Sequence, residues 1–424
     1  MKVSCDINLH HLTRVEGHGN IRIRIASGKV REATWEVVET PRFFEAMLVG
    51  KKWENAPYIC ARICGICSIG HTLASIRAVE KAFGFEPDQQ TNRLRLLLKH
   101  METLQSHILH LYFLVAPDFF DTSSVLPLVE SHPEDVRRAA GLKLLANDAC
   151  DLIGGRRLHP TRTVVGGFTM VPNKDELRHL RQRLAGAVAD LQQTGKLFGG
   201  FHLPDFERET EFVSLRGEND YPFIGGDLIS SDGVHKKEGE YREMSNEYCT
   251  PQSTAKWSAL SRRSFAVGAL ARLNNNFHLL HGKARELAEQ FHLQPVFHNP
   301  FMNNIAQLIE CMHVVEDAII LIDQLLGSKL HDPKQTVAPR AGKGVGAVEV
   351  PRGTLYHMYE FDGEGRIIRA DCVIPTGQNH ANIQHDIEVL AEKSAAAGLG
   401  DREIEKLAGM LVRAYDPCIS CSVH

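Results

Sequence analysis

The sequence carries a Cys-x-x-Cys pair close to each of its ends, and any fold must account for both pairs. The first is Cys64-Gly65-Ile66-Cys67, and the second is Cys418-Ile419-Ser420-Cys421. The two-residue gap in each pair lets both sulfurs converge on one metal ion from a single turn. Four thiolates form a soft donor set, which selects zinc, nickel or iron–sulfur iron over hard cations. We therefore expect a fold that brings the two ends of the chain together around a metal site.

The residues alone leave several kinds of metal site open. Two such pairs are typical of structural zinc, but zinc ribbons usually keep their pairs within about 15–20 residues. Here the interval from Cys67 to Cys418 spans most of the chain. An iron–sulfur cluster held by four cysteines also fits, whereas a thioredoxin-type redox pair lacks its βαβ context. A catalytic metal is the third possibility, because neighbouring side chains of the kind that hydrogen-bond metal ligands flank both pairs. These neighbours are Arg62, His71, Asp416 and His424.

Composition places the chain among ordinary globular proteins and narrows its partners. It has 424 residues, of which 43% are hydrophobic and 24% charged. Such a length allows two lobes or one large domain with insertions, because single cores rarely grow beyond about 250–300 residues. The net charge is −4 with both signs well mixed, so we expect no nucleic-acid partner. No apolar run approaches the ~20 residues that span a bilayer, so we expect no membrane span.

Cysteine usage and the first residues indicate a cytoplasmic protein. Six of the ten cysteines are scattered outside the two pairs, unlike the disulfide framework of a secreted domain. The segment from Met1 to His18 carries charged residues and no apolar stretch of the signal-peptide type. We therefore expect a reducing environment.

Periodicity predicts long helices joined to smaller β elements. Alternating Ile21, Ile23 and Ile25 predict a hairpin over 18–40 that turns at Ser27-Gly28. Residues 200–256 have no helical period and indicate a β-containing insertion. Helix signals include a capping-box spacing at Ser131–Glu134, a similar one at Asn173–Glu176, and a stop at Pro117. The expected helices are 68–83, 89–116, 257–291, 301–326, 386–397 and 402–414. The expected later strands are 348–350, 354–360 and 367–374, after the glycines at 342, 344 and 346.

Three further residues are candidates for chemistry. Glu16 lies between Arg14 and His18 and could be a buried proton carrier, although a salt bridge at a strand end explains the pattern as well. Glu45 falls on a short predicted helix, where a glutamate is usually solvated. Arg352 follows Pro351 at a strand break and could assist a metal site.

At this point the sequence resembles a known family. The stretches from Arg62 to His71 and from Asp416 to His424 are similar to the two signature motifs of the large, catalytic subunit of [NiFe] hydrogenases. The segment 14–18 resembles the N-terminal motif of that family, and 351–353 resembles its arginine motif. The segments 41–45 and 114–119 are most similar to the soluble multisubunit group that includes sulfhydrogenases and NAD(P)-linked enzymes.

The resemblance implies a fold and a metal centre. The fold is mainly α with smaller antiparallel β elements, an α+β class. Residues 1–424 would form one domain with a central bundle of long helices, an N-terminal hairpin and a C-terminal β segment. Cys64 and Cys418 would be terminal nickel ligands, and Cys67 and Cys421 would bridge nickel and iron. The iron would carry carbon monoxide and cyanide.

The resemblance also assigns the surrounding residues. Pro351, Arg352 and Thr376 match positions that pack against the diatomic ligands, and Glu16 matches the carboxylate that passes protons away from a terminal cysteine. Other residues match ligands of a magnesium or iron ion near the C-terminus, or side chains around the centre. The ion ligands are Glu45, His424 and the backbone carbonyl of Cys372, and the surrounding side chains are His71, Asp118 and Asp416. Many relatives have an aliphatic residue in place of Cys372, so we treat its thiol as incidental.

The implied activity is reversible heterolytic cleavage of H2, with Glu16, Arg352 and Cys418 as the catalytic residues. An iron–sulfur small subunit would receive the electrons, because this chain has no further cluster motif. Flavin and iron–sulfur subunits are expected beyond it. The alternative is a zinc-stapled structural subunit related to a respiratory complex I core subunit, a relative that lacks the cysteine motifs.

Overall fold

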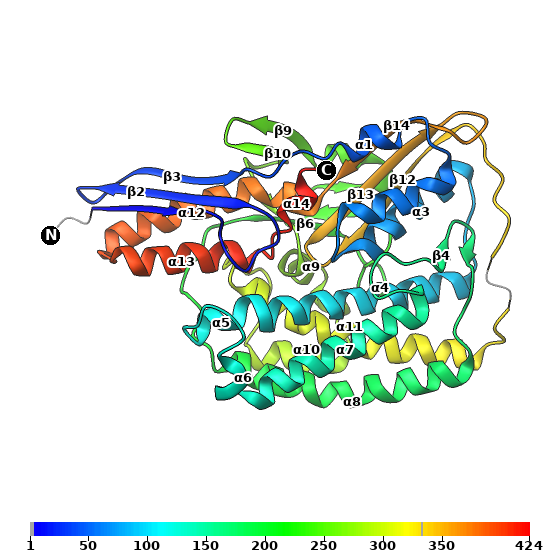
Figure 1. The fold of residues 1–424 in the computed structure, drawn as a ribbon, viewed down its shortest axis with the longest axis horizontal. Helices are drawn as coiled ribbons and strands as arrows, with labels where there is room; N and C mark the ends of the chain where they lie inside the picture. The colour runs from blue at the N-terminus through cyan, green and yellow to red at the C-terminus, as the bar shows by residue number, and fades with distance from the viewer. Residues whose placement is uncertain (1–3, 332–333) are drawn as a thin grey trace.

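The computed structural model describes residues 4–331 and 334–424, with a helical bundle on one side and sheets with their covering helices on the other (Figure 1). This arrangement confirms the predicted mainly α architecture with smaller antiparallel β elements. Helix α11 packs between α4 and α8, and α7 packs against α4. The bundle helices are α4 (Gln89–Leu109), α7 (Pro133–Gly154), α8 (Lys174–Gly199), α10 (Gly282–Gln290) and α11 (Met302–Gly327).

Polar caps begin two of these helices. The Asp88 carboxylate accepts the Thr91 N–H at 2.7 Å at the start of α4. Asn173 and Glu176 form the predicted capping box at the start of α8. The predicted capping box at Ser131 is wrong, because the Ser131 hydroxyl donates back to the Pro127 carbonyl instead.

Pro117 does not end the long helix, in contrast to the expectation from sequence. Helix α4 continues through a π-helical turn, His110–Val115, into α5 (Ala116–Phe119). The Ala116 N–H reaches back to the carbonyl of Leu111, five residues earlier. Pro117 therefore lies in the first turn of a new helical segment, where its missing N–H costs nothing.

The sheet β12-β13-β14 packs directly on α3 (Ser68–Phe83), a helix with the predicted bounds. The strands are β12 (Gly342–Val350), β13 (Gly353–Phe361) and β14 (Ile367–Val373). Gly342, Gly344 and Gly346, which were expected to precede a strand, lie inside β12. A Cβ at Gly342, Gly344 or Gly346 would come within 2.5 Å of an α3 backbone carbonyl. Only glycine lets the strand approach the helix this closely.

The predicted hairpin at the N-terminus is part of a larger sheet. Strands β2 (Gly19–Ala26) and β3 (Lys29–Val37) pair antiparallel, and β1 (Cys5–Leu9) adds an outer strand. The sheet order is β1-β2-β3-β10-β9, so strands from the predicted insertion complete it. Those strands are β9 (Asn246–Thr250) and β10 (Ser253–Ala259). The prediction of helix over 257–291 is wrong at its start, because β10 runs to Ala259 and the first helix begins at Ala269.

Two C-terminal helices cover this sheet and lead the chain back to the centre of the molecule (Figure 1). They are α12 (Pro375–Ala397) and α13 (Asp401–Ala414), followed by the short α14 (Ile419–Ser422). The N-terminal segment before β2 and the C-terminal segment after α13 therefore meet. Shorter elements are α1 (Phe44–Leu48), α2 (Ala56–Cys60), α6 (Leu128–Ser131), α9 (Ala269–Asn276), β4 (Thr163–Val164), β5 (Gly167–Phe168), β6 (Glu211–Leu215), β7 (Leu228–Ser230), β8 (His235–Lys236) and β11 (Phe265–Ala266).

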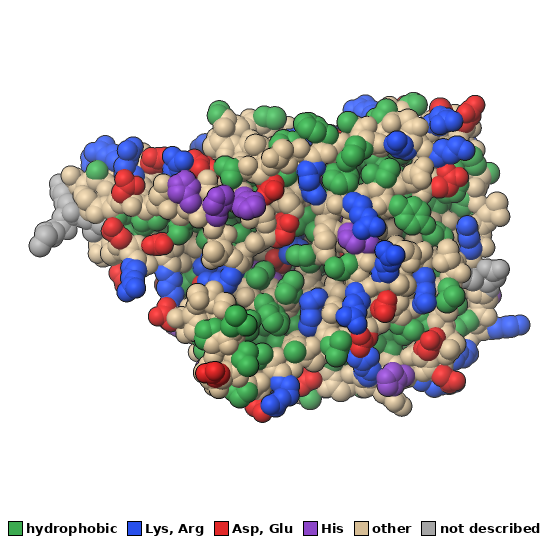
Figure 2. Space-filling model, viewed as in Figure 1, with side chains coloured by type: hydrophobic (Ala, Val, Ile, Leu, Met, Phe, Trp, Pro, Cys, Tyr) green, Lys and Arg blue, Asp and Glu red, His purple; other side chains and the backbone are tan. Residues whose placement is uncertain are grey.

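The described surface carries mixed charge. Figure 2 shows basic and acidic side chains interspersed over the visible face rather than separated by sign. Within residues 4–331 and 334–424, none of the helices combines the length and the apolar character that crossing a bilayer requires.

Candidate metal centre

The two cysteine pairs meet in the interior, as the spacing argument requires. Cys64 and Cys67 immediately precede α3, and Cys418 immediately precedes α14. The Cys64 and Cys418 sulfurs lie 3.6 Å apart, although 354 residues separate them in the chain. The Cys64, Cys418 and Cys421 sulfurs all lie within 4.8 Å of one another, as do the Cys67 and Cys421 sulfurs and a ring nitrogen of His71. All four cysteines are buried.

The four sulfurs differ in their surroundings. The sulfurs of Cys418 and Cys421 lie against each other, and metal binding requires both of them as thiolates. The Cys64 sulfur accepts the N–H groups of Ile66 and Cys67, each at 3.2 Å. A hydrogen bond from the Cys67 thiol and the charge of Arg352 lower the pKa of Cys64 against the effect of burial. Cys64 is therefore better prepared to be a thiolate than Cys67, whose pKa the hydrogen bond to Cys64 and burial raise.

Glu16 lies against the second cysteine pair. Its Oε2 is 3.1 Å from the Cys418 sulfur and accepts the Ser420 N–H at 3.1 Å, while its Oε1 accepts the Ser420 hydroxyl. A backbone hydrogen bond from the Ile419 N–H to the Glu16 carbonyl aligns the segment around Glu16 with the second cysteine pair. Gly17 has φ +86°, and a Cβ there would lie 2.8 Å from the Ser420 nitrogen. Glycine at this position permits the close approach of the two segments.

Arg352 is buried and tied to one side of the site. Its Nε donates to the Asp416 carbonyl at 2.6 Å, and Nη2 donates to the Asp416 carboxylate at 2.8 Å. Its Nη1 finds no partner among the described residues, although it is buried. Burial is the largest single effect and works to lower the pKa of Arg352, but the negative charges around it, with Asp416 first among them, together raise the pKa above its ordinary value. The guanidinium therefore stays a fixed cation.

Thr376 and Pro351 lie beside these groups. The Thr376 hydroxyl accepts the backbone N–H of Cys418 at 3.0 Å, at the first turn of α12. Pro351 is buried next to Arg352 in the turn between β12 and β13. Thr376 thus holds the backbone of Cys418. Pro351 belongs to the buried turn that carries Arg352.

His71 faces a second buried histidine. Its Nδ1 lies 3.1 Å from His357 Nε2, and the His357 Nδ1 lies 2.7 Å from the Tyr359 hydroxyl. Burial first, and then neighbouring charges including that of Arg42, hold the pKa of His71 well below its ordinary value. His71 is thus neutral at pH 7, the form in which imidazole accepts a proton or binds a metal.

The three groups expected around a C-terminal ion also meet. His424 Nε2 lies 2.7 Å from the Cys372 carbonyl and 3.6 Å from Glu45 Oε1. The Glu45 carboxylate also accepts the Cys372 N–H at 2.8 Å. Burial alone would raise the pKa of Glu45. His424, the Cys372 N–H and Lys256 lower this pKa instead, to about 2.

Asp118 contacts arginines rather than the cysteine sulfurs. Its carboxylate accepts from Arg413 at 2.7 and 2.8 Å and also from Arg14. Arg14 is two residues from Glu16, and Arg413 lies three residues before Asp416. Asp118 thus joins the N-terminal segment to the end of α13.

Sequence reasoning assigned no role to Arg42, although it stands in one of the matched segments. Its Nη2 donates to the carbonyl of Ile63 at 2.7 Å and to the carbonyl of Ser420. These carbonyls precede Cys64 and Cys421, so one guanidinium joins the two cysteine segments. An arginine three residues before a candidate ion ligand was the available signal, but it could not reveal partners that lie far away in sequence.

The donor sets fit the expected groups. Four converging sulfurs suit a soft metal, and carboxylate, carbonyl and imidazole donors suit a harder ion such as magnesium or ferrous iron. Arg352 Nη1, for which the described residues supply no acceptor, is a buried donor with capacity for an acceptor bound at the sulfur site.

Comparison with known proteins identifies the family. The profile of the nickel-dependent hydrogenases matches residues 42–143 and 235–424, more than half of the chain. A second profile, described as HoxL-like, matches residues 6–40. Both ends of the chain, which build the sulfur site, fall within the matched segments.

Relatives and solved structures agree with the profiles. Sulfhydrogenase 1 subunit alpha of Pyrococcus furiosus is 38% identical over 99% of this chain and 97% of the relative. The NAD-reducing hydrogenase HoxS subunit beta of Cupriavidus necator is 29% identical over 97% of this chain and 93% of the relative. A crystal structure of an H2-reduced NAD+-reducing [NiFe]-hydrogenase superposes with a TM-score of 0.89 at 26% identity, covering 99% and 100% of the two chains.

These matches favour the enzyme over the zinc-stapled scaffold, which none of them supports. The chain belongs to the nickel-dependent hydrogenase family and is the large, catalytic subunit of a hydrogenase, an oxidoreductase that acts on H2.

Proposed function

We propose that the four cysteines hold a nickel–iron centre. Cys64 and Cys418 are the terminal nickel ligands, and Cys67 and Cys421 bridge the two metals. The observation that carries this proposal is the convergence of four buried sulfurs from opposite ends of the chain. The 3.6 Å approach of the Cys64 and Cys418 sulfurs suits two ligands of one ion.

The iron of this centre carries carbon monoxide and cyanide. Arg352, Pro351 and Thr376 form the wall against which these ligands pack. The buried Nη1 of Arg352, without a partner in the described part of the chain, supplies a charge-assisted donor for an anionic ligand such as cyanide.

The activity is heterolytic cleavage of H2 in either direction. When bound, the metal centre would supply the Lewis acidity that polarises H2, and it would take up the electron pair that leaves through the small subunit. Cys418 Sγ takes the proton first, and Glu16 Oε2, 3.1 Å away, receives it next. Arg352 is a poor base because the pKa of an arginine exceeds about 12. It serves instead as a positive charge fixed on Asp416.

A second ion binds near the C-terminus. Glu45, the Cys372 carbonyl and His424 hold magnesium or iron there. The closeness of His424 Nε2 to both oxygens supports this site. The Cys372 thiol lies 3.8 Å from His357 Nδ1 instead, so the carbonyl is the group that this residue offers to the ion.

Electrons leave through an iron–sulfur small subunit and then through flavin and iron–sulfur subunits. The names of the Pyrococcus and Cupriavidus relatives, which denote subunits of larger enzymes, support such a complex. We place the protein in the cytoplasm, in line with its scattered cysteines. Residues 1–424 act as one domain, because the main hydrophobic cluster joins the bundle helices to both terminal segments.

Infrared spectroscopy with metal analysis of the anaerobically purified complex tests the centre. We expect about one nickel per chain, with iron, and bands from bound cyanide and carbonyl. Zinc in place of nickel, or a spectrum without these bands, would overturn the proposal. Magnesium or additional iron in the same preparation would report the second ion.

A further inference from the structure

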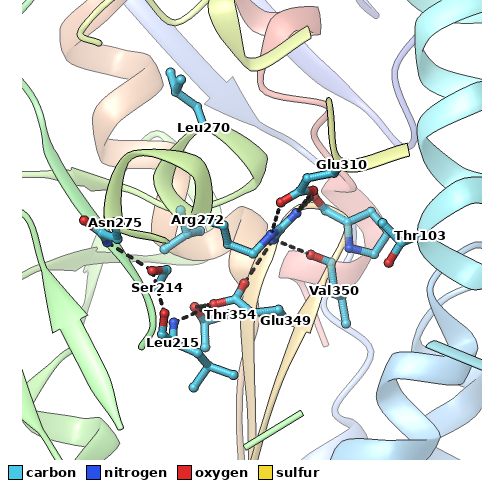
Figure 3. A network of polar contacts seen from close by, with 12 residues as sticks. Thr103, Ser214, Leu215, Leu270, Arg272, Asn275, Glu310, Glu349, Val350 and Thr354 are labelled. Carbon is cyan, nitrogen blue, oxygen red and sulfur yellow. Dashed lines mark hydrogen bonds and ion pairs between the residues drawn. The ribbon is translucent and has the colours of Figure 1, made fainter. Parts of the chain in front are cut away.

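Arg272, on α9, is a fully buried arginine that the proposed chemistry does not use. It is 0% exposed, as are its partners Glu310 on α11 and Glu349 on β12. Its Nε and Nη2 donate to the two oxygens of Glu310 at 2.7 and 2.6 Å, a bidentate pair (Figure 3). The Nη1 donates to Glu349 Oε2 at 3.0 Å. The guanidinium is thus held between two carboxylates.

The same guanidinium also holds the backbone that leads to Arg352. Its Nη1 donates to the Val350 carbonyl at 2.9 Å, and its Nη2 donates to the Pro351 carbonyl at 3.2 Å (Figure 3 shows the Val350 contact). These two carbonyls immediately precede Arg352. A planar fork with several donors can hold two carbonyls and two carboxylates at once, which a lysine ammonium cannot do in the same geometry.

Glu349 connects this network to strand β13, on the other side of the 350–353 turn. Its Oε1 accepts the Thr354 hydroxyl at 2.7 Å and the Leu215 N–H at 2.7 Å. Residues 349 and 354 pair across the start of the β12–β13 hairpin. Contacts from Arg272 and Glu349 therefore surround the turn of residues 350–353 on both strands.

We propose that Arg272 is a positioning residue, which fixes the 350–353 turn so that the buried Nη1 of Arg352 faces the sulfur site. Arg352 itself is anchored through Asp416, which belongs to the C-terminal segment. Its backbone therefore needs a separate anchor on the β12–β13 side. This inference rests on the proposed role of Arg352 beside the iron ligands.

A merely structural role is the competing explanation. Buried ion pairs are often no more stabilising than apolar residues of the same volume, and removing one partner is costly in any case. Loss of stability in an Arg272 variant would therefore not distinguish the two roles. The test needs a matched buried arginine that does not contact the turn.

Arg95 provides that control. It is buried, forms a bidentate pair with Glu80 at 2.7 Å on both oxygens, and donates to the Val164 carbonyl at 3.0 Å. Its network resembles that of Arg272 but holds a different backbone segment. Arg272→Lys and Arg95→Lys are compared with each other and with Arg352→Lys.

The first readout is hydrogen–deuterium exchange of the peptide spanning 349–354 in the complete complex. We expect Arg272→Lys to speed exchange there by about tenfold, because the turn opens more often, while Arg95→Lys leaves it unchanged. Equal exchange rates of this peptide in Arg272→Lys, Arg95→Lys and the unchanged protein would overturn the proposal. Glu349→Gln replaces Arg272→Lys in this experiment if the latter does not assemble. It keeps the side-chain shape and the acceptor for Thr354, and we expect it to speed exchange in the same peptide.

The second readout is the infrared spectrum of the iron ligands. We expect Arg272→Lys to shift the cyanide bands in the direction that Arg352→Lys shifts them, whereas Arg95→Lys leaves them in place. Unshifted bands in Arg272→Lys would overturn the inference. If the unchanged complex lacks such bands, the proposed function fails, and the exchange experiment still decides whether Arg272 positions the turn.

Discussion

Glu16 Oε2 lies 3.1 Å from the sulfur of Cys418, although 402 residues separate the two in sequence. The Ser420 N–H and hydroxyl hold the same carboxylate. Glu16 therefore has a fixed position, set by the backbone of the second cysteine pair. A carboxylate held at this distance from a sulfur satisfies the geometric condition for proton transfer between them.

Replacing Glu16 by glutamine tests this transfer. Glutamine keeps the size and an acceptor for Ser420 but cannot take up a proton. We expect the rate of D2/H+ exchange to fall by about 10²-fold or more, with unchanged nickel and iron content. The control is Glu39→Gln, a carboxylate that pairs with His18 away from the sulfurs. Exchange at the unchanged rate in Glu16→Gln would remove Glu16 from the proton path.

Much of this site could be predicted from the sequence because local signals were strong. Helix 68–83 was predicted with its observed bounds, since an apolar period begins right after Cys67 and Gly84 ends it in a left-handed conformation. The alternation of Ile21, Ile23 and Ile25 predicted the hairpin over 18–40, and the structure pairs residues 19–26 with 29–37. The resemblance then named the cysteines that the structure brings together.

Features that depend on distant partners were missed. The glycines of β12 resembled a loop because the sequence does not show that α3 lies against them. Pro117 looked like a helix end, since a π-helical turn gives no sequence signal that we could use. Arg42 and Arg272 were overlooked for the same reason, because other segments contribute their acceptors, which are carbonyls and, for Arg272, also carboxylates.

Arg42 is expected to hold the two cysteine segments together. Arg42→Gln removes the donors to the Ile63 and Ser420 carbonyls. Hydrogen bonds from a charged donor contribute about 1.5–3 kcal/mol, so we expect a lower unfolding temperature and faster loss of nickel to a chelator. Arg22→Gln, which changes a surface arginine paired with Glu36, should alter neither. An unchanged rate of nickel loss in Arg42→Gln would contradict the prediction.

The ion proposed near the C-terminus can be tested through its ligands. His424→Ala should lower the magnesium or iron content by one ion per chain and make the unfolding temperature insensitive to a chelator of that ion. Cys372→Ala is the matched variant, because it removes the thiol but keeps the carbonyl that faces His424. We expect this variant to retain the ion. Equal ion content in His424→Ala and the unchanged protein would reject the site.

His380 provides a pH-dependent contribution to stability. It is fully buried on α12, and its Nδ1 accepts the Trp35 indole N–H at 3.0 Å. Because indole nitrogen is only a donor, His380 carries its proton on Nε2 and donates it to the Ser422 hydroxyl at 2.9 Å. Burial lowers the pKa of His380 to about 3. The folded protein therefore keeps this imidazole neutral where an exposed one is protonated.

Between pH 6.5 and about 3 the unfolded chain binds one more proton at His380 than the folded chain. The free energy of unfolding must therefore fall as pH falls through this window, with His380 contributing about 1.4 kcal/mol per pH unit. His380→Gln keeps an acceptor for Trp35 and a donor for Ser422 but does not titrate. We expect its urea midpoint to decline less steeply on acidification. His179→Gln, at an exposed position, should leave the slope unchanged. Equal slopes in the His380 variant and the unchanged protein would contradict this assignment.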